Sequence, residues 1–153
     1  MRPAGLALWL GVAGVVGLAC GPRHPRAIAY GTEACAHCHM AIADPRFSAE
    51  AITTTGKIIV FDDVGCLAAW LGENRAVESA WVSSFVDGRW LLASSAVYLK
   101  TDSLHSPMAS GMVALRPGRE ADSVRAALGG ALTSWQAVLA APPQHTPVPI
   151  PAS

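Results

Sequence analysis

Charge of either sign is scarce in this sequence and evenly balanced. Lys and Arg number 11, Asp and Glu also number 11, and charged residues make up 14% of the 153 positions. Basic residues do not form a stripe or alternate with aromatic ones, which argues against a nucleic-acid-binding protein. The sequence also lacks a Ser-His-Asp pattern, a phosphate-binding glycine loop and a carboxylate pair for acid-base work. We therefore expect a protein that is not an enzyme and has no nucleic acid among its partners.

The first twenty residues have the organisation of a bacterial export signal. Arg2 is followed by an uncharged, mostly apolar stretch that ends with Gly17, Ala19 and Cys20. Small residues directly before a cysteine resemble a lipobox, in which that cysteine receives lipid and becomes the first residue of the mature chain. We expect a signal peptide at 1–19 and a protein lipid-anchored at Cys20, on the periplasmic side of a bacterial membrane. A plain secretory signal and an N-terminal membrane helix are the alternatives.

The rest of the chain divides into a tether, one domain and a tail. Residues 20–29 are expected to form the lipidated tether, and residues 30–141 are expected to form the domain. The segment 142–153 contains Pro142, Pro143 and three further prolines, so we expect a disordered or polyproline-like tail.

Hydrophobic periodicity predicts a small compact α+β domain, with two half-domains that repeat the order strand, strand, helix, strand. Strands are expected at 48–54, 57–61, 80–86, 90–98 and 112–115. Asp62 or Asp63 is expected to cap a helix that extends to about Gly72. A second helix is expected at 123–140, where Gly129 and Gly130 can break it into two pieces. Trp81, Trp90 and Trp135 are expected in the core.

The cysteine count indicates ligands rather than disulfides. The chain has four cysteines, and setting Cys20 aside leaves Cys35, Cys38 and Cys66. Because an odd number cannot all pair, at least one thiol is free, bound to a ligand or shared between molecules. Cys66 is expected to point away from the apolar face of its helix, and a position near the helix start predicts a lowered pKa.

The segment 35–40 concentrates two thiols, two imidazoles and a thioether. Cys35, Cys38 and Met40 offer soft sulfur donors, which Cu(I) prefers, whereas a thioether has little affinity for zinc, calcium or magnesium. Met108 and Met112 lie in a second loop rich in proline and glycine, which a fold could bring near the first. The sequence therefore predicts a copper(I) site.

Several ordered blocks resemble the NosL family of copper-binding lipoproteins. They are Cys35-x-x-Cys38-x-Met40-x-Ile42-x-Asp44-x-Arg46-Phe47, Phe61-Asp62-Asp63-x-Gly65-Cys66-Leu67, Ala96-x-Tyr98 and Pro107-Met108-x-x-Gly111 followed by Ala114. The resemblance implies a periplasmic metallochaperone that delivers copper(I) for maturation of nitrous oxide reductase. It also implies an ABC-transporter assembly complex as partner and two small ββαβ-like halves. Cys35, Cys38, Met40 and Met108 match the sulfur-bearing motifs, and further candidate ligands are Cys66, His39, Met112 and His105.

One departure from that family opens an alternative. His39 stands where relatives commonly have glycine, and it completes Cys35-x-x-Cys38-His39, the motif that attaches c-type haem. Met108 would then be available as the distal ligand of a small electron-transfer protein. The strand-rich stretch between the two sites favours copper, as do Met40 and Cys66, which haem leaves unexplained.

Three other interpretations use the same cysteines. A thiol-disulfide redox protein would need the C-x-x-C motif to open a helix after a strand, and the predicted elements do not provide this. A zinc site would need a second ligand pair. A structural disulfide between Cys35 and Cys38, with Met40 in the core, is the simplest alternative.

Overall fold

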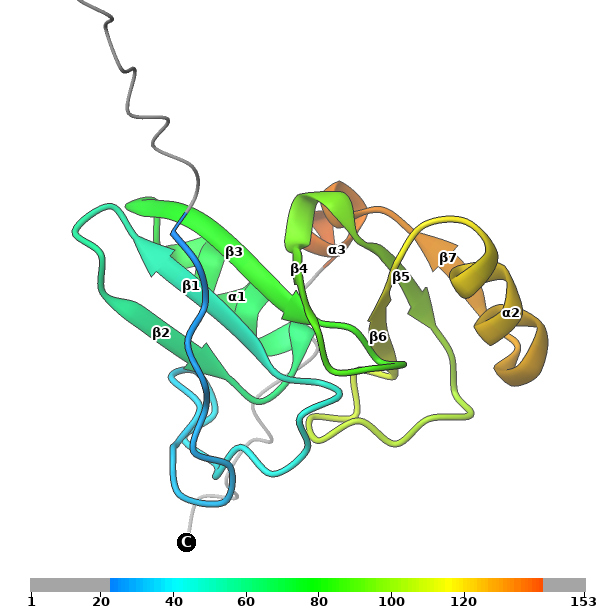
Figure 1. Ribbon diagram of the computed structural model, residues 1–153, viewed down its shortest axis with the longest axis horizontal. Coiled ribbons are helices and arrows are strands. Elements are labelled where there is room, and N and C mark those ends of the chain that lie inside the picture. Colours follow the sequence, from blue (N-terminus) through cyan, green and yellow to red (C-terminus); the bar gives the residue numbers. More distant parts are fainter. Residues whose placement is uncertain (1–22, 142–153) are drawn as a thin grey trace, which may run out of the picture.

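The computed structural model describes residues 23–141. Two successive ββαβ units make up this part of the chain, and each has its own antiparallel sheet (Figure 1). This arrangement confirms the α+β class and the two repeated halves expected from the sequence.

In the first unit, β1 (Ala49–Thr53) lies between β2 (Ile58–Phe61) and β3 (Val77–Ser83). Helix α1 (Val64–Glu73) connects β2 to β3, and β4 (Trp90–Leu92) extends the sheet beyond β3. The β1–β2 hairpin and α1 agree with the sequence prediction.

The second unit repeats this topology with shorter elements. Strand β5 (Val97–Lys100) lies between β6 (Met112–Leu115) and β7 (Ala131–Thr133), and helix α2 (Arg119–Leu128) precedes β7. A last helix, α3 (Trp135–Ala140), packs against α1 and β5 and so joins the two units. A bridge between Ser84 and Ala114 also links the two sheets.

Two sequence predictions were wrong in detail. The strand expected at 90–98 is interrupted by a 3₁₀ turn, Ala93–Ser95, so its two ends belong to different sheets. The helix expected at 123–140 contains β7 between two helices. Gly130 has a φ of 94°, and a Cβ there would lie 2.2 Å from the Lys100 carbonyl oxygen. Only glycine allows the chain to enter β7 so close to β5.

The predicted tryptophans occupy the core to different extents. Trp81 and Trp135 are buried, whereas Trp90 is half-buried. Trp135 stacks on Tyr98 with ring centroids 5.4 Å apart. The buried Tyr98 hydroxyl donates to the Ala93 carbonyl oxygen at 2.7 Å. These contacts fix α3 against the second sheet.

Residues 23–29, within the range that the sequence assigns to the tether, run across the face of the first sheet that is nearest the viewer in Figure 1. Ile28 is buried, and the Arg26 backbone N–H donates to Glu50 Oε2 at 3.1 Å. The Glu50 side chain is fully buried, and its Oε1 has no hydrogen-bond partner among the described residues. Burial raises the pKa of Glu50 to about 7.

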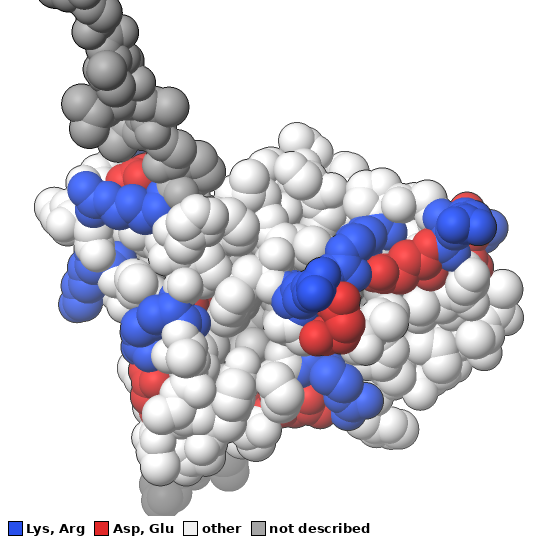
Figure 2. Space-filling model, in the orientation of Figure 1, with Lys and Arg blue, Asp and Glu red and all other residues white. Residues whose placement is uncertain are grey.

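The expected signal peptide, Cys20 and the tail at 142–153 lie outside the described residues. No helix within residues 23–141 has both the length and the apolar character that crossing a membrane requires. On the face in Figure 2, basic and acidic side chains lie beside one another. Among the ion pairs of the described residues, Arg116 pairs with Asp87 and Glu120 at 3.0 and 2.9 Å.

Candidate metal centre

Three cysteines from two distant segments form one cluster. The sulfur atoms of Cys35, Cys38 and Cys66 all lie within 4.8 Å of one another. Cys35 and Cys66 are buried, Cys38 is half-buried, and all three are free cysteines. The structure therefore adds Cys66 to the pair that the C-x-x-C motif identifies.

A tight loop holds the first two cysteines. A β-bridge between Ala34 and Ala41 closes its base. The Cys35 N–H donates to the Met40 carbonyl oxygen at 2.8 Å, and the His39 N–H donates to the Cys35 carbonyl oxygen at 3.0 Å. These bonds fold the motif back on itself, so that Cys35 is buried in the domain and Cys38 lies half-buried at its edge.

The start of α1 supplies the third cysteine. Asp63 caps this helix by accepting a hydrogen bond from the Gly65 N–H at 2.6 Å. Cys66 lies in the same hydrophobic cluster as Val64 and Leu67. Cys66 is buried even though helical periodicity places it away from the apolar face, because the cysteine loop adds a second buried surface to the helix.

The pKa values of the three thiols shift in different directions. The Cys66 thiol donates to the Cys35 sulfur, and this hydrogen bond is the main cause of a lowered Cys35 pKa. Burial opposes that shift, while backbone N–H groups of the loop and of Asp62 reinforce it. Burial raises the pKa of Cys38, and donation to Cys35 raises that of Cys66. The lowered pKa expected at Cys66 occurs at Cys35 instead, because the Cys66 thiol donates to Cys35 and backbone N–H groups also converge there.

Two adjacent carboxylates border the cluster with different roles. Asp62 is buried, and burial followed by the nearby Cys35 raises its pKa to about 6. Asp62 Oδ1 has no hydrogen-bond partner among the described residues. Asp63 caps α1 and accepts a hydrogen bond from the Ser110 hydroxyl at 2.9 Å. Asp63 thus fixes both the helix that carries Cys66 and the loop at 106–111.

The other predicted ligands do not all lie together. Met108 is half-buried and packs against the core cluster that contains the three cysteines, and Met112 is buried in it. The Met40 side chain is 54% exposed. His39 and His105 are also exposed. The alternative that placed Met40 in the core was wrong, because its carbonyl oxygen, not its thioether, closes the loop.

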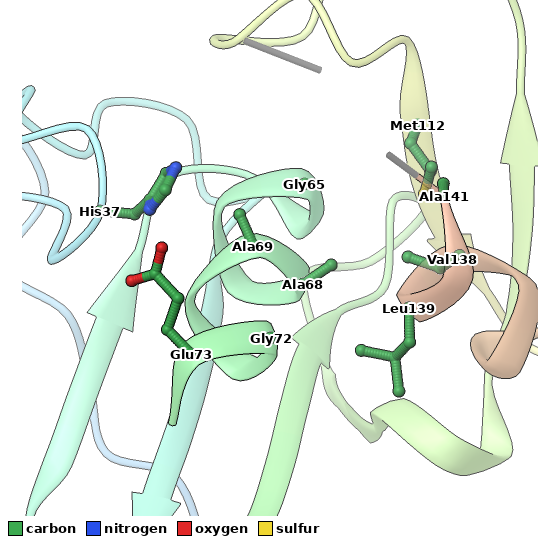
Figure 3. A pocket seen from close by; sticks show the side chains of 10 residues that line it. All are labelled: His37, Gly65, Ala68, Ala69, Gly72, Glu73, Met112, Val138, Leu139 and Ala141. Atoms are coloured by element: carbon green, nitrogen blue, oxygen red, sulfur yellow. The ribbon is translucent and has the colours of Figure 1, made fainter. Parts of the chain in front are cut away.

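His37 is the residue that sequence reasoning passed over. It lies inside the C-x-x-C motif and is half-buried. Its side chain faces a groove beside α1 (Figure 3). The sequence did contain a sign of it, because His37 is one of the two imidazoles in the segment 35–40.

We expect replacement of Ser110 with alanine to destabilise the protein by about 1–3 kcal/mol, since a buried hydroxyl bonded to a carboxylate is lost. Ser110 also contacts the Ser106 hydroxyl at 3.0 Å and accepts from the Met112 N–H at 3.2 Å. Urea unfolding measures the effect. Ser103→Ala is the matched control, because Ser103 is exposed. Equal losses in both variants would show that the Ser110–Asp63 bond does not hold the loop.

We expect replacement of His39 with glycine to stabilise the protein by about 0.5–1 kcal/mol. His39 has a φ of 63°, a conformation that costs non-glycine residues about 1–2 kcal/mol. Greater chain entropy of glycine in the unfolded state offsets part of the gain. The same φ accounts for the glycine common at this position in the family that the sequence resembles.

His105→Gly is the control for this substitution, because His105 is exposed and outside the left-handed region. There we expect a loss of about 0.5–1 kcal/mol. Urea unfolding of both variants tests the prediction, and a loss at both positions would contradict it.

The donor set suits a soft metal ion. An ion bound to three thiolates at about 2.3 Å holds the sulfurs about 4 Å apart, so the observed cluster needs little adjustment. Covalent haem fits less well, because its thioether bond would require Cys35 to leave its buried contact with Cys66. The C-x-x-C segment forms a turn and does not open a helix, so the redox motif expected of a thiol-disulfide oxidoreductase is absent from this loop.

Comparison with known proteins gives the same fold. No protein-family model and no curated protein matches the chain. Among solved structures, the chain is similar to the copper chaperone NosL from Shewanella denitrificans, with 22% identity and a TM-score of 0.65. The match covers 76% of this chain and 96% of that one. At this identity the comparison establishes a NosL-like fold.

Proposed function

We propose that this chain is a copper(I)-binding metallochaperone that holds one ion on Cys35, Cys38 and Cys66. The observation that carries the proposal is the convergence of three sulfur atoms within 4.8 Å of one another. Few structural roles require three free thiols in contact. The NosL-like fold supports the proposal, because the similar solved structure is that of a copper chaperone.

Sulfur chemistry favours copper(I) over harder ions. Thiolate ligands bind Cu(I), Zn(II) and iron-sulfur clusters. A thioether ligand in the same site favours Cu(I) over Zn(II). Met108 is the thioether best placed to join, because Ser110 ties its loop to the helix start that carries Cys66. We therefore include Met108 as a fourth ligand in the proposal and assign exposed Met40 to ion entry and exit.

Transfer would occur by ligand exchange from the side of Cys38. Cys35 and Cys66 are buried, whereas Cys38 is half-buried and the neighbouring His39 and Met40 are exposed. An incoming ligand from a partner can reach the ion only where the shell meets solvent. Replacement of one sulfur at a time releases the ion without a barrier as high as full dissociation. No covalent turnover is involved, which agrees with the expected absence of enzyme activity.

The recipient and location follow from the sequence resemblance. We propose that the lipid anchor at Cys20 holds the protein on the periplasmic side of the membrane. There it would supply copper to nitrous oxide reductase together with an ABC-transporter assembly complex. Co-purification of the full chain with these components, lost when Cys35 and Cys38 are both replaced by serine, would support this partnership.

Copper(I) titration of the reduced, purified protein against a competing chelator tests the function. We expect one equivalent of Cu(I) and a new ultraviolet thiolate-to-copper absorption. Failure to compete for stoichiometric copper would reject the proposal. Preferential retention of zinc over Cu(I) would instead identify a zinc site on the three thiolates.

A visible spectrum separates copper from haem. The protein is produced in a periplasm that contains the haem-attachment machinery, and it is then denatured. We expect no Soret band. An intense Soret band that survives denaturation would prove covalent haem on Cys35 and Cys38 and would overturn the metallochaperone assignment.

A further inference from the structure

A mostly apolar groove separates α1 from α3 (Figure 3). Its floor is formed by small residues that recur on one face of α1: Gly65, Ala68, Ala69 and Gly72. A Cβ added at Gly72 would meet no atom within 4 Å. The absence of large side chains on this face leaves room for a chain to lie directly on the helix.

The opposite wall of the groove is hydrophobic and partly open. Val138 and Leu139 of α3 face α1 in Figure 3, and Met112 of β6 lies at one end. Leu139 is 44% exposed, so this part of the wall is accessible to a ligand. His37 and Glu73 are the polar side chains of the lining and lie on the far side of α1 from α3.

The chain leaves the described structure from inside this groove. Ala141 is the last described residue and contributes to the lining. Its φ of −67° and ψ of 139° are those of a polyproline II helix. Pro142 and Pro143 follow, and a residue before proline is restricted to this extended conformation. The last described residue therefore already has the conformation that a polyproline segment requires.

We propose that the C-terminal segment Pro142–His145 docks in cis into the groove between α1 and α3. Polyproline segments bind apolar grooves at low entropic cost, because their conformation is already formed. Four such residues span about 12 Å, which is enough to cross a helix about 10 Å wide. Proline rings cover the small residues of α1, and His145 reaches the side where Glu73 and His37 lie.

Covalent attachment makes even a weak contact sufficient. A segment joined to the rim of its own site has an effective concentration in the millimolar range. The segment 142–153 contains no Asp, Glu, Lys or Arg, so docking buries no unpaired side-chain charge other than that of a protonated His145, which would meet the Glu73 carboxylate. An apolar groove and an uncharged, proline-rich tail are thus matched in chemistry as well as position.

Nuclear magnetic resonance of the full chain tests this docking without any metal. We expect nuclear Overhauser effects between the Pro143 ring and the Ala69 methyl group. Gly72→Leu fills the groove from a position with open space, and Pro143→Ala removes one ring. Gly72→Leu is expected to reduce those signals at least twofold, and each substitution is expected to shift the Ala69 methyl resonance.

Two matched controls make the test specific. Pro149→Ala removes a ring beyond the docked segment, and Ala127→Leu enlarges an exposed position on α2. Both should leave the Ala69 signals unchanged. Absence of the Pro143–Ala69 effects in folded wild-type protein would overturn the proposal, as would equal losses in Pro149→Ala. Effects that arise between molecules in a mixed-isotope sample would also overturn it, because a second copy would then occupy the groove.

Discussion

Replacement of Cys66 with serine is expected to lower the affinity for Cu(I) by about 100-fold or more, equivalent to about 3 kcal/mol. Serine keeps the volume and a hydrogen-bond donor to Cys35 but removes one of three soft ligands. The sulfur of Cys66 lies within 4.8 Å of both other sulfurs. A hydroxyl oxygen is a poor ligand for a soft ion, so only two thiolates and Met108 would remain.

Competition titration with a copper(I) chelator measures this loss. Ala51→Ser is the matched control, because Ala51 is fully buried in the same core cluster and also gains a hydroxyl. The control should lose stability but keep wild-type copper affinity. Wild-type affinity in Cys66→Ser would show that the ion is held without the third cysteine, as the C-x-x-C motif alone would predict.

Met108→Ala addresses the remaining ligand in the same titration. A loss of about tenfold would identify Met108 as a ligand, since weaker thioether donors contribute less than thiolates. Unchanged affinity would remove the distant loop from the site while leaving the three-cysteine cluster intact. The two variants together therefore define the ligand set.

At neutral pH the buried Glu50 carboxyl is expected to lower the free energy of unfolding by about 3 kcal/mol, and replacement with glutamine is expected to remove this loss. Burial raises the Glu50 pKa from 4.5 to about 7. Between these values the folded protein keeps a proton that the unfolded chain releases. The stabilising contribution is therefore complete below about pH 4.5 and is lost as the pH rises to about 7. Glutamine stays neutral, so the variant should exceed wild type in stability at neutral pH.

Urea unfolding at pH values from about 5 to about 8 checks this expectation. The free energy of unfolding of wild type minus that of Glu50→Gln isolates the titration of this carboxyl, because other groups, Asp62 included, contribute to both proteins. Glu78→Gln serves as control, since Glu78 is an exposed glutamate on the neighbouring strand β3. A constant difference between wild type and Glu50→Gln across this range would show that Glu50 is already ionised in the folded protein.

Local signals predicted much of the fold. The β1–β2 hairpin, the Asp63 cap and the strand at Met112–Leu115 follow from alternation, turn residues and capping, which depend on near neighbours in sequence. The prediction of one strand at 90–98 was wrong because the turn at Ala93–Ser95 contains no glycine or proline, and the exposed Ser94 and Ser95 are also compatible with a strand. Strand β7 was missed because it has three residues and lies between two helices.

The sequence by itself predicted that the sulfurs of Cys35 and Cys38 lie together, because two cysteines three residues apart meet in a tight turn. Its patterning also predicted the strand, strand, helix, strand order of the first half, whereas the second half was expected in full only from the family resemblance. Only the tertiary structure decided the place of Cys66 and the loop of Met108. Those positions depend on contacts such as Ser110 to Asp63, which are 47 residues apart. Helical periodicity assigns one buried face to α1, but the packed cysteine loop covers a second one, and Cys66 is buried there.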